Sequence, residues 1–117
     1  MKINTQAQSL DQVGAHARQG DTLLRRLSSP VPREVKQIKS PTLALGEHTG
    51  HHHTFTEGGA IAFADDELAA TADYVRVTAP EAPLTHQEHE TIVFPKGDYE
   101  SLKQMEYTPA ELKRVAD

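Results

Sequence analysis

The sequence predicts a mostly β fold: a small antiparallel β-barrel or sandwich with a polar N-terminal arm and a short C-terminal helix. From Pro41 onward, short apolar runs end at turn residues, a pattern typical of all-β domains. No stretch of that region has the 3.6-residue apolar period of a long amphipathic helix. Aromatic residues make up 5% of the chain, with no Trp, so the core is expected to be small and built from Val, Leu, Ile and Ala.

Residues 1–40 are expected to form an N-terminal arm and connector, and residues 41–117 the β domain with its C-terminal helix. The first 20 residues are polar, and Gly14 and Gly20 interrupt their thin apolar stripe, which fits an arm or a short, weakly anchored helix. A chain of this length has room for one core, so the arm is expected to need a partner to become ordered.

Residues 22–27 fit either a strand or one helical turn. Pro30 and Pro32 follow and hold the chain extended, because proline lacks a backbone N–H and restricts the residue before it. Residues 33–40 show no clear apolar period and are expected to cross the surface before the first regular strand.

Five to seven strands are expected in the β domain. The apolar runs that predict them lie at residues 42–45, 51–55, 60–63, 74–77, 91–94 and 99–107. Turn residues separate these runs, most clearly at residues 57–59 and at Pro95 to Gly97.

At the C-terminus, residues 108–115 have the strongest helix signal in the chain. Thr108 suits the N-cap and Pro109 suits the first helical position. Glu111 stands at the third position, from which a carboxylate can reach back to the cap. A short helix is therefore predicted there.

Composition and charge argue against several classes of function. Seventeen acidic residues against 12 basic ones give a formal net charge of -5, which makes nucleic acid an unexpected partner, because nucleic-acid binders need clustered Lys and Arg. The N-terminus has no apolar run, so neither a signal peptide nor a membrane span is expected, and a cytoplasmic or virion location is the default. Without Cys, a bound metal would need His and carboxylate ligands.

Histidine is the unusual residue of this sequence. Four of the seven lie between residues 48 and 53, and two more lie at positions 86 and 89. On a strand, His51 and His53 project from one face together with Phe55, while His52 points the other way. Two imidazoles on one face can chelate a divalent transition metal such as zinc, iron or nickel if a further ligand comes from elsewhere.

Three residues are candidates for that further ligand: His86, His89 and Glu57. A turn would bring His86 and His89 together, whereas an extended chain would point them to opposite sides and let at most one coordinate. The predicted metal ligands are therefore His51 and His53 with one or more of these three. The alternatives are a solvated loop, or a pH-dependent interface in which protonation of all seven His changes the net charge from -5 to +2.

The motif His51-x-His53 with Glu57 resembles the first motif of the cupin family. By that resemblance these three residues would be metal ligands on a strand of a small β-barrel, and the chain would be a cupin-like metal-dependent enzyme of unknown substrate. Four residues separate Gly46 from His51, where the family has about five. Pro95-x-Gly97 matches part of the second cupin motif, but the His that follows it in the family is missing.

A second resemblance covers residues 42–109 and concerns small uncharacterised proteins of bacteria, phages and prophages. Four stretches carry it, in this order: Thr49-Gly50-His51-x-His53, Leu84-Thr85-His86-x-Glu88-His89, Phe94-Pro95-x-Gly97-x-Tyr99 and Glu106-Tyr107-Thr108-Pro109. The resemblance implies a compact β domain from a mobile element and no specific activity. Since no catalytic pairing stands out, a binding or structural protein is favoured over an enzyme, as a homo-oligomer or a part of a larger protein assembly.

Overall fold

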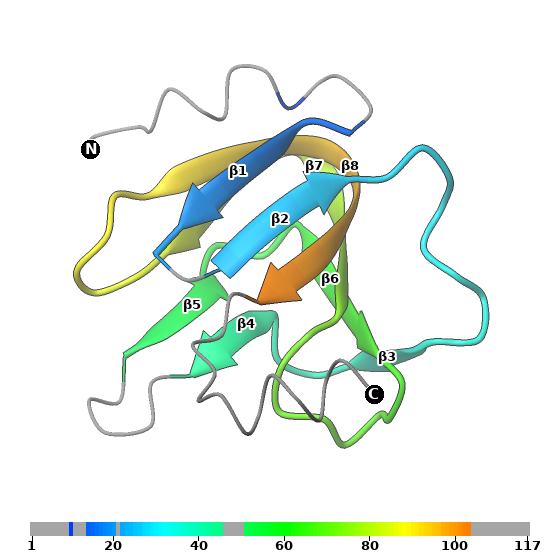
Figure 1. Ribbon diagram of the computed structural model, residues 1–117. Helices are drawn as coiled ribbons and strands as arrows, with labels where there is room; N and C mark the ends of the chain where they lie inside the picture. The colour runs from blue at the N-terminus through cyan, green and yellow to red at the C-terminus, as the bar shows by residue number, and fades with distance from the viewer. Residues whose placement is uncertain (1–9, 11–13, 21, 46–50, 104–117) are drawn as a thin grey trace, which may run out of the picture.

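The computed structural model describes residue 10 and residues 14–20, 22–45 and 51–103, and in these it contains eight strands and no helix. The strands are β1 (His16–Gln19), β2 (Thr22–Arg26), β3 (Lys36–Ile38), β4 (Thr42–Leu45), β5 (His52–Phe55), β6 (Ala60–Ala64), β7 (Tyr74–Thr85) and β8 (Ile92–Lys103). They form one antiparallel sheet that curls into a half-barrel (Figure 1). The prediction of a mostly β, antiparallel, barrel-like fold is confirmed, and the predicted C-terminal helix lies outside the described residues.

The long strands β7 and β8 form the central pair of the sheet. Their register shifts between Val77 and Glu81, where β7 has more residues than β8. Before the shift the buried residues of β7 include Val75 and Val77, and beyond it they are Ala82 and Leu84, so the core face changes from odd to even positions. Such a bulge bends a strand, and the bend helps to curl the sheet around its core.

Shorter strands pair with both edges of this central pair. β2 and then β1 continue the sheet from β8. β7 pairs with β6 along its first half and with β5 near its end, and these two strands carry β3 and β4 respectively. The side chains that point inward form one core, whose largest fully buried members are Tyr99, Phe94, Leu10, Leu24, Leu43, Leu84 and Ile92.

Part of the segment that was predicted as an arm and connector lies within the sheet. Residues 22–27 contain a strand, one of the two conformations expected there, and β1 and β3 were not expected. β1 buries Ala17 and Gln19 and exposes His16 and Arg18, an alternation too short to stand out in the sequence. Leu10 is also fully buried, so this part of the chain contributes to the core.

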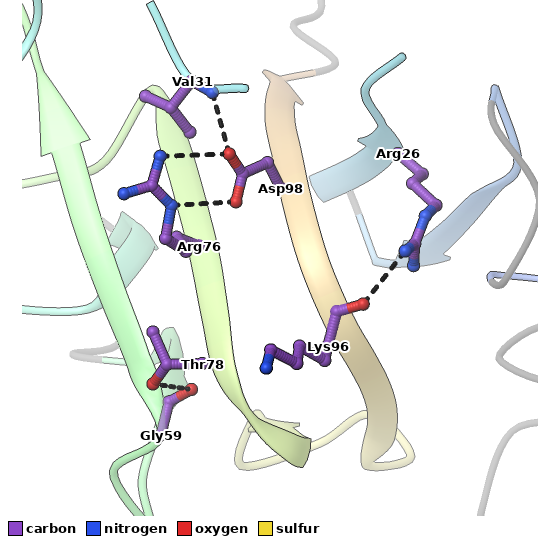
Figure 2. Close-up of polar contacts among 7 residues, drawn as sticks. All are labelled: Arg26, Val31, Gly59, Arg76, Thr78, Lys96 and Asp98. Atoms are coloured by element: carbon purple, nitrogen blue, oxygen red, sulfur yellow. Dashed lines mark hydrogen bonds and ion pairs between the residues drawn. The ribbon is translucent and has the colours of Figure 1, made fainter. Parts of the chain in front are cut away.

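The prediction of a turn at Pro95 to Gly97 is wrong, because these residues lie inside β8. Gly97 has a φ of +155°, and a Cβ atom on it would lie 2.7 Å from the guanidinium of Arg26. That guanidinium donates to the carbonyl of Lys96 (Figure 2). It also lies 5.7 Å from the centre of the Tyr99 ring. The glycine thus leaves space for Arg26 and does not reverse the chain. Burial raises the pKa of Tyr99 to about 12, although Arg26 acts in the opposite direction.

Asp98 joins β8 to β7 and to the connection between β2 and β3. Its carboxylate accepts a hydrogen bond of 2.8 Å from the backbone N–H of Val31 and pairs with Arg76 at 3.0 Å (Figure 2). The hydrogen bond that Arg76 donates to Asp98 also raises the pKa of Arg76. A single carboxylate therefore holds three segments together on the outside of the sheet.

Candidate metal centre

Four histidines from two distant segments come together at one end of the half-barrel. His53 lies in β5 and His51 directly precedes that strand, and His86 and His89 lie in the connection between β7 and β8. Both segments are at the left of the view in Figure 1. Ring centroids lie 4.3 Å apart for His53 and His86, 4.6 Å for His86 and His89, 5.6 Å for His51 and His86, and 6.0 Å for His53 and His89. We call these four residues the histidine cluster.

The pairing of β5 with β7 brings the two segments together. Thr54 lies opposite Thr85 in an antiparallel register, so the residue before Thr54 meets the residue after Thr85. These residues are His53 and His86. His53 and Phe55 are both buried on the inner face of β5, as the alternation predicted.

Gln19 of β1 fixes the proton position on His53. Its amide nitrogen donates to the backbone carbonyls of Leu84 and Glu90, each at 2.8 Å. Its Oε1 can only accept, so the 2.8 Å contact with Nδ1 of His53 is a hydrogen bond that the ring donates. Neutral His53 then carries its proton on Nδ1 and has a lone pair on Nε2. Metal-ligating histidines have this arrangement, with the second ring nitrogen held by an outer hydrogen bond.

His86 has the opposite tautomer. The backbone N–H of Glu88 donates to Nδ1 of His86 at 3.0 Å, so in a neutral ring the proton is on Nε2. Two other contacts tie this loop to the start of β5. The carboxylate of Glu88 lies 3.6 Å from Nδ1 of His51, and the backbone N–H of His52 donates to the side chain of Gln87 at 2.9 Å.

His89 lies against Gly20, in the turn between β1 and β2. A Cβ atom on Gly20 would be 2.6 Å from Nε2 of His89 and 3.3 Å from Cε1 of His53. Gly20 also has a φ of +58°, a conformation that L side chains rarely adopt. The turn can therefore lie this close to His89 and His53 only because residue 20 has no side chain.

The remaining candidate residues lie elsewhere. Glu57 is exposed in the turn that follows β5, roughly 13 Å of extended chain from His53. His52 is on the other side of β5 from His53, and His16 is exposed at the start of β1. His48 is outside the described residues. The structure thus brings together four of the five predicted ligands and leaves Glu57 apart.

Sequence reasoning missed Gln19 and Gly20. Both come from the hairpin of β1 and β2, which reaches the cluster only through the folding of the whole sheet. A signal was present, since Gly20 separates two short stretches of alternating side chains, which is typical of a hairpin turn. That signal predicts the hairpin and not its position beside the histidines.

The separations in the cluster are comparable to those around a metal ion. Two imidazoles on one tetrahedral zinc have ring centroids about 5 Å apart, and the four measured separations range from 4.3 to 6.0 Å. Within the described ranges, no group of three or more His, Asp or Glu residues is arranged to hold a metal ion. A metal would therefore require the rings to rotate. In the same part of the chain, no helix is long and apolar enough to cross a membrane.

Comparison with known proteins gives one match. The model of the family described as Domain of unknown function (DUF8820) matches residues 18–104. The matched segment includes β2 to β8 and all four residues of the histidine cluster. No curated protein and no solved structure matches the chain.

Proposed function

The chain belongs to the DUF8820 family of domains of unknown function, and we propose that this β domain binds a divalent transition-metal ion at the histidine cluster. The convergence of four imidazoles from two segments is the observation that carries the proposal. Zinc, iron and nickel all accept imidazole ligands. In this proposal His51 and His53 are ligands, together with one or both of His86 and His89.

Hydrogen bonding and charge support the proposal. His53 is 4% exposed, and Gln19 prepares its Nε2 as a ligand atom. Imidazole binds a metal in its neutral form. A ring that donates a hydrogen bond through one nitrogen and has a lone pair on the other is already in that form. Two carboxylates, Glu88 and Glu90, are exposed in the same loop and attract cations to this end of the sheet.

The experiment is elemental analysis of full-length protein purified without an affinity tag or a metal column, followed by zinc and nickel titrations. We expect one ion per chain and a melting temperature that rises with metal concentration, because ligand binding to the native state stabilises it. His53→Ala is expected to weaken binding roughly 100-fold, since a structural zinc contributes about 10–16 kcal/mol through four ligands.

Two histidines outside the cluster provide matched controls. His16→Ala and His52→Ala remove an imidazole from β1 and from the opposite side of β5. Both variants are expected to bind metal as the natural chain does. The proposal would be contradicted if these variants lose as much metal affinity as His53→Ala does. Substoichiometric metal together with an unchanged melting temperature would contradict it as well.

Gly20→Ala is expected to weaken zinc binding at least tenfold, because its Cβ would displace His89 and press on His53. The unfavourable φ is expected to cost a further 1–2 kcal/mol or so of stability. Gly58→Ala is the matched control: Gly58 has a φ of +74° and open space around its Cβ position. Both variants should lose similar stability, and only Gly20→Ala should lose zinc affinity. Titration calorimetry and urea unfolding measure the two effects, and equal zinc affinity in the two variants would count against a site at His89.

Other expectations from the sequence stay predictions. These are a homo-oligomer or a larger assembly, an origin in a bacterium or phage, and a cytoplasmic or virion location. A cupin-like metal-dependent enzyme is the alternative proposal, and it would use the same histidines.

A further inference from the structure

We infer that His86 is not a metal ligand but a hydrogen-bond donor to a small anionic ligand that occupies an open position on the bound ion. This inference rests on the proposed function. Its starting point is the hydrogen bond from the backbone N–H of Glu88 to Nδ1 of His86, at 3.0 Å.

That hydrogen bond determines what His86 can do. A backbone N–H can only donate, so Nδ1 uses its lone pair to accept, and the neutral ring has its single proton on Nε2. A protonated nitrogen has no lone pair for a metal. To become a ligand, His86 would have to give up its bond to Glu88 or lose its last ring proton. His53, held by Gln19 in the other tautomer, needs neither change.

The position of His86 in the cluster fits a donor. Its ring centroid lies 4.3 Å from His53, 4.6 Å from His89 and 5.6 Å from His51. It is therefore next to the other three histidines, which are the ligands if His86 is not one. An ion bound by three histidines has a fourth tetrahedral position open to an exogenous ligand, and that ligand would lie within the group of rings that contains His86.

Charge indicates the class of this ligand. Three neutral imidazoles leave both positive charges of a divalent ion uncompensated, and Nε2–H of His86 adds a donor beside it. Both features favour a small anion that has a lone pair for the metal and another for His86, such as hydroxide, a carboxylate or azide. The sequence alone is compatible with joint coordination by His86 and His89, and the hydrogen bond to Nδ1 of His86 gives His86 a different role.

The test uses the full chain loaded with cobalt(II), whose visible absorption reports coordination, and azide as the anion probe. Two variants are compared with the natural chain: His86→Phe removes the donor and keeps a ring, and His86→Gln replaces it with an amide N–H. We expect cobalt affinity to change less than about threefold in both variants. Azide affinity is expected to fall about tenfold in His86→Phe, the effect of losing one hydrogen bond, and to recover in part in His86→Gln.

The outcomes separate this inference from the proposed function. If the natural chain does not bind cobalt, both fail. If it binds cobalt and His86→Phe loses it to the same extent as His53→Ala, the metal site stands and His86 is a ligand, so the inference is wrong. If cobalt binds equally and azide affinity is the same in the natural chain and in His86→Phe, His86 is not the donor, and the inference is again wrong.

Discussion

Phe94→Ala is expected to lower the free energy of unfolding by about 3–5 kcal/mol, a large part of the roughly 5–15 kcal/mol that stabilises a small domain. Phe94 is fully buried where β7 and β8 bend. Its ring makes edge contacts with Phe55 of β5 at 5.7 Å and with Tyr99 of β8 at 5.3 Å, so truncation leaves a cavity beside these two rings. Urea denaturation followed by circular dichroism measures the loss.

Leu68→Ala serves as the control for Phe94→Ala. Leu68 is 86% exposed, and its truncation is expected to change stability by less than about 0.5 kcal/mol. Phe94→Leu keeps part of the ring volume and should fall between the two, which preserves a measurement if Phe94→Ala does not fold. Equal stability of Phe94→Ala and Leu68→Ala would show that the aromatic contacts do not hold the core together.

Much of the β domain could be predicted because its signals are local. The predicted runs at residues 42–45, 51–55 and 60–63 match β4, β5 and β6 to within one residue at each end. Each of these strands is short and is followed by Gly or by polar residues, which mark strand ends wherever the strand lies in the sheet.

The sequence pattern predicts β7 and β8 too short, because proline usually marks the end of a strand. Pro80 lies within the shift between Val77 and Glu81, where the regular ladder is interrupted, so its missing N–H breaks no regular pair there. Pro95 likewise lies within β8. A local pattern shows that proline disturbs a strand. Whether the chain reverses there or continues as a bent strand depends on the pairing with neighbouring strands.

The candidate site could be predicted only in part for a similar reason. Residue type and alternation identify His51 and His53 as neighbours, and the second pair of histidines stands out by composition. Gln19 is one of many polar residues near the N-terminus, and no local feature indicates its role. It reaches His53 because the sheet curls and brings β1 back towards β5, although β2, β8 and β7 separate the two strands in the strand order. Contacts across such a curl depend on strand order, which a single sequence does not reveal.

Gln19→Leu is expected to lower the free energy of unfolding by about 3–5 kcal/mol, because three polar groups lose their partner at roughly 1–3 kcal/mol each. These groups are the carbonyls of Leu84 and Glu90 and the Nδ1–H of His53. Gln19 is only 2% exposed, so water cannot easily replace its amide. Gln37→Leu makes the same change at an exposed position of β3 and is expected to be nearly neutral.

Gln19→Leu is also expected to weaken zinc binding by the folded protein about 10–100-fold, the usual effect of losing an outer hydrogen bond to a metal-ligating histidine. Gln19→Glu separates this effect from stability. Its carboxylate can still accept the hydrogen bond from Nδ1–H of His53. Its other oxygen is an acceptor that faces the carbonyls of Leu84 and Glu90 and cannot form a hydrogen bond with them. Gln19→Glu should therefore lose stability as Gln19→Leu does, and retain more of the zinc affinity. If calorimetry at a temperature where both variants are folded finds natural zinc affinity in Gln19→Leu, the hydrogen bond to His53 serves the fold alone, and the ligand must be held in place by other contacts.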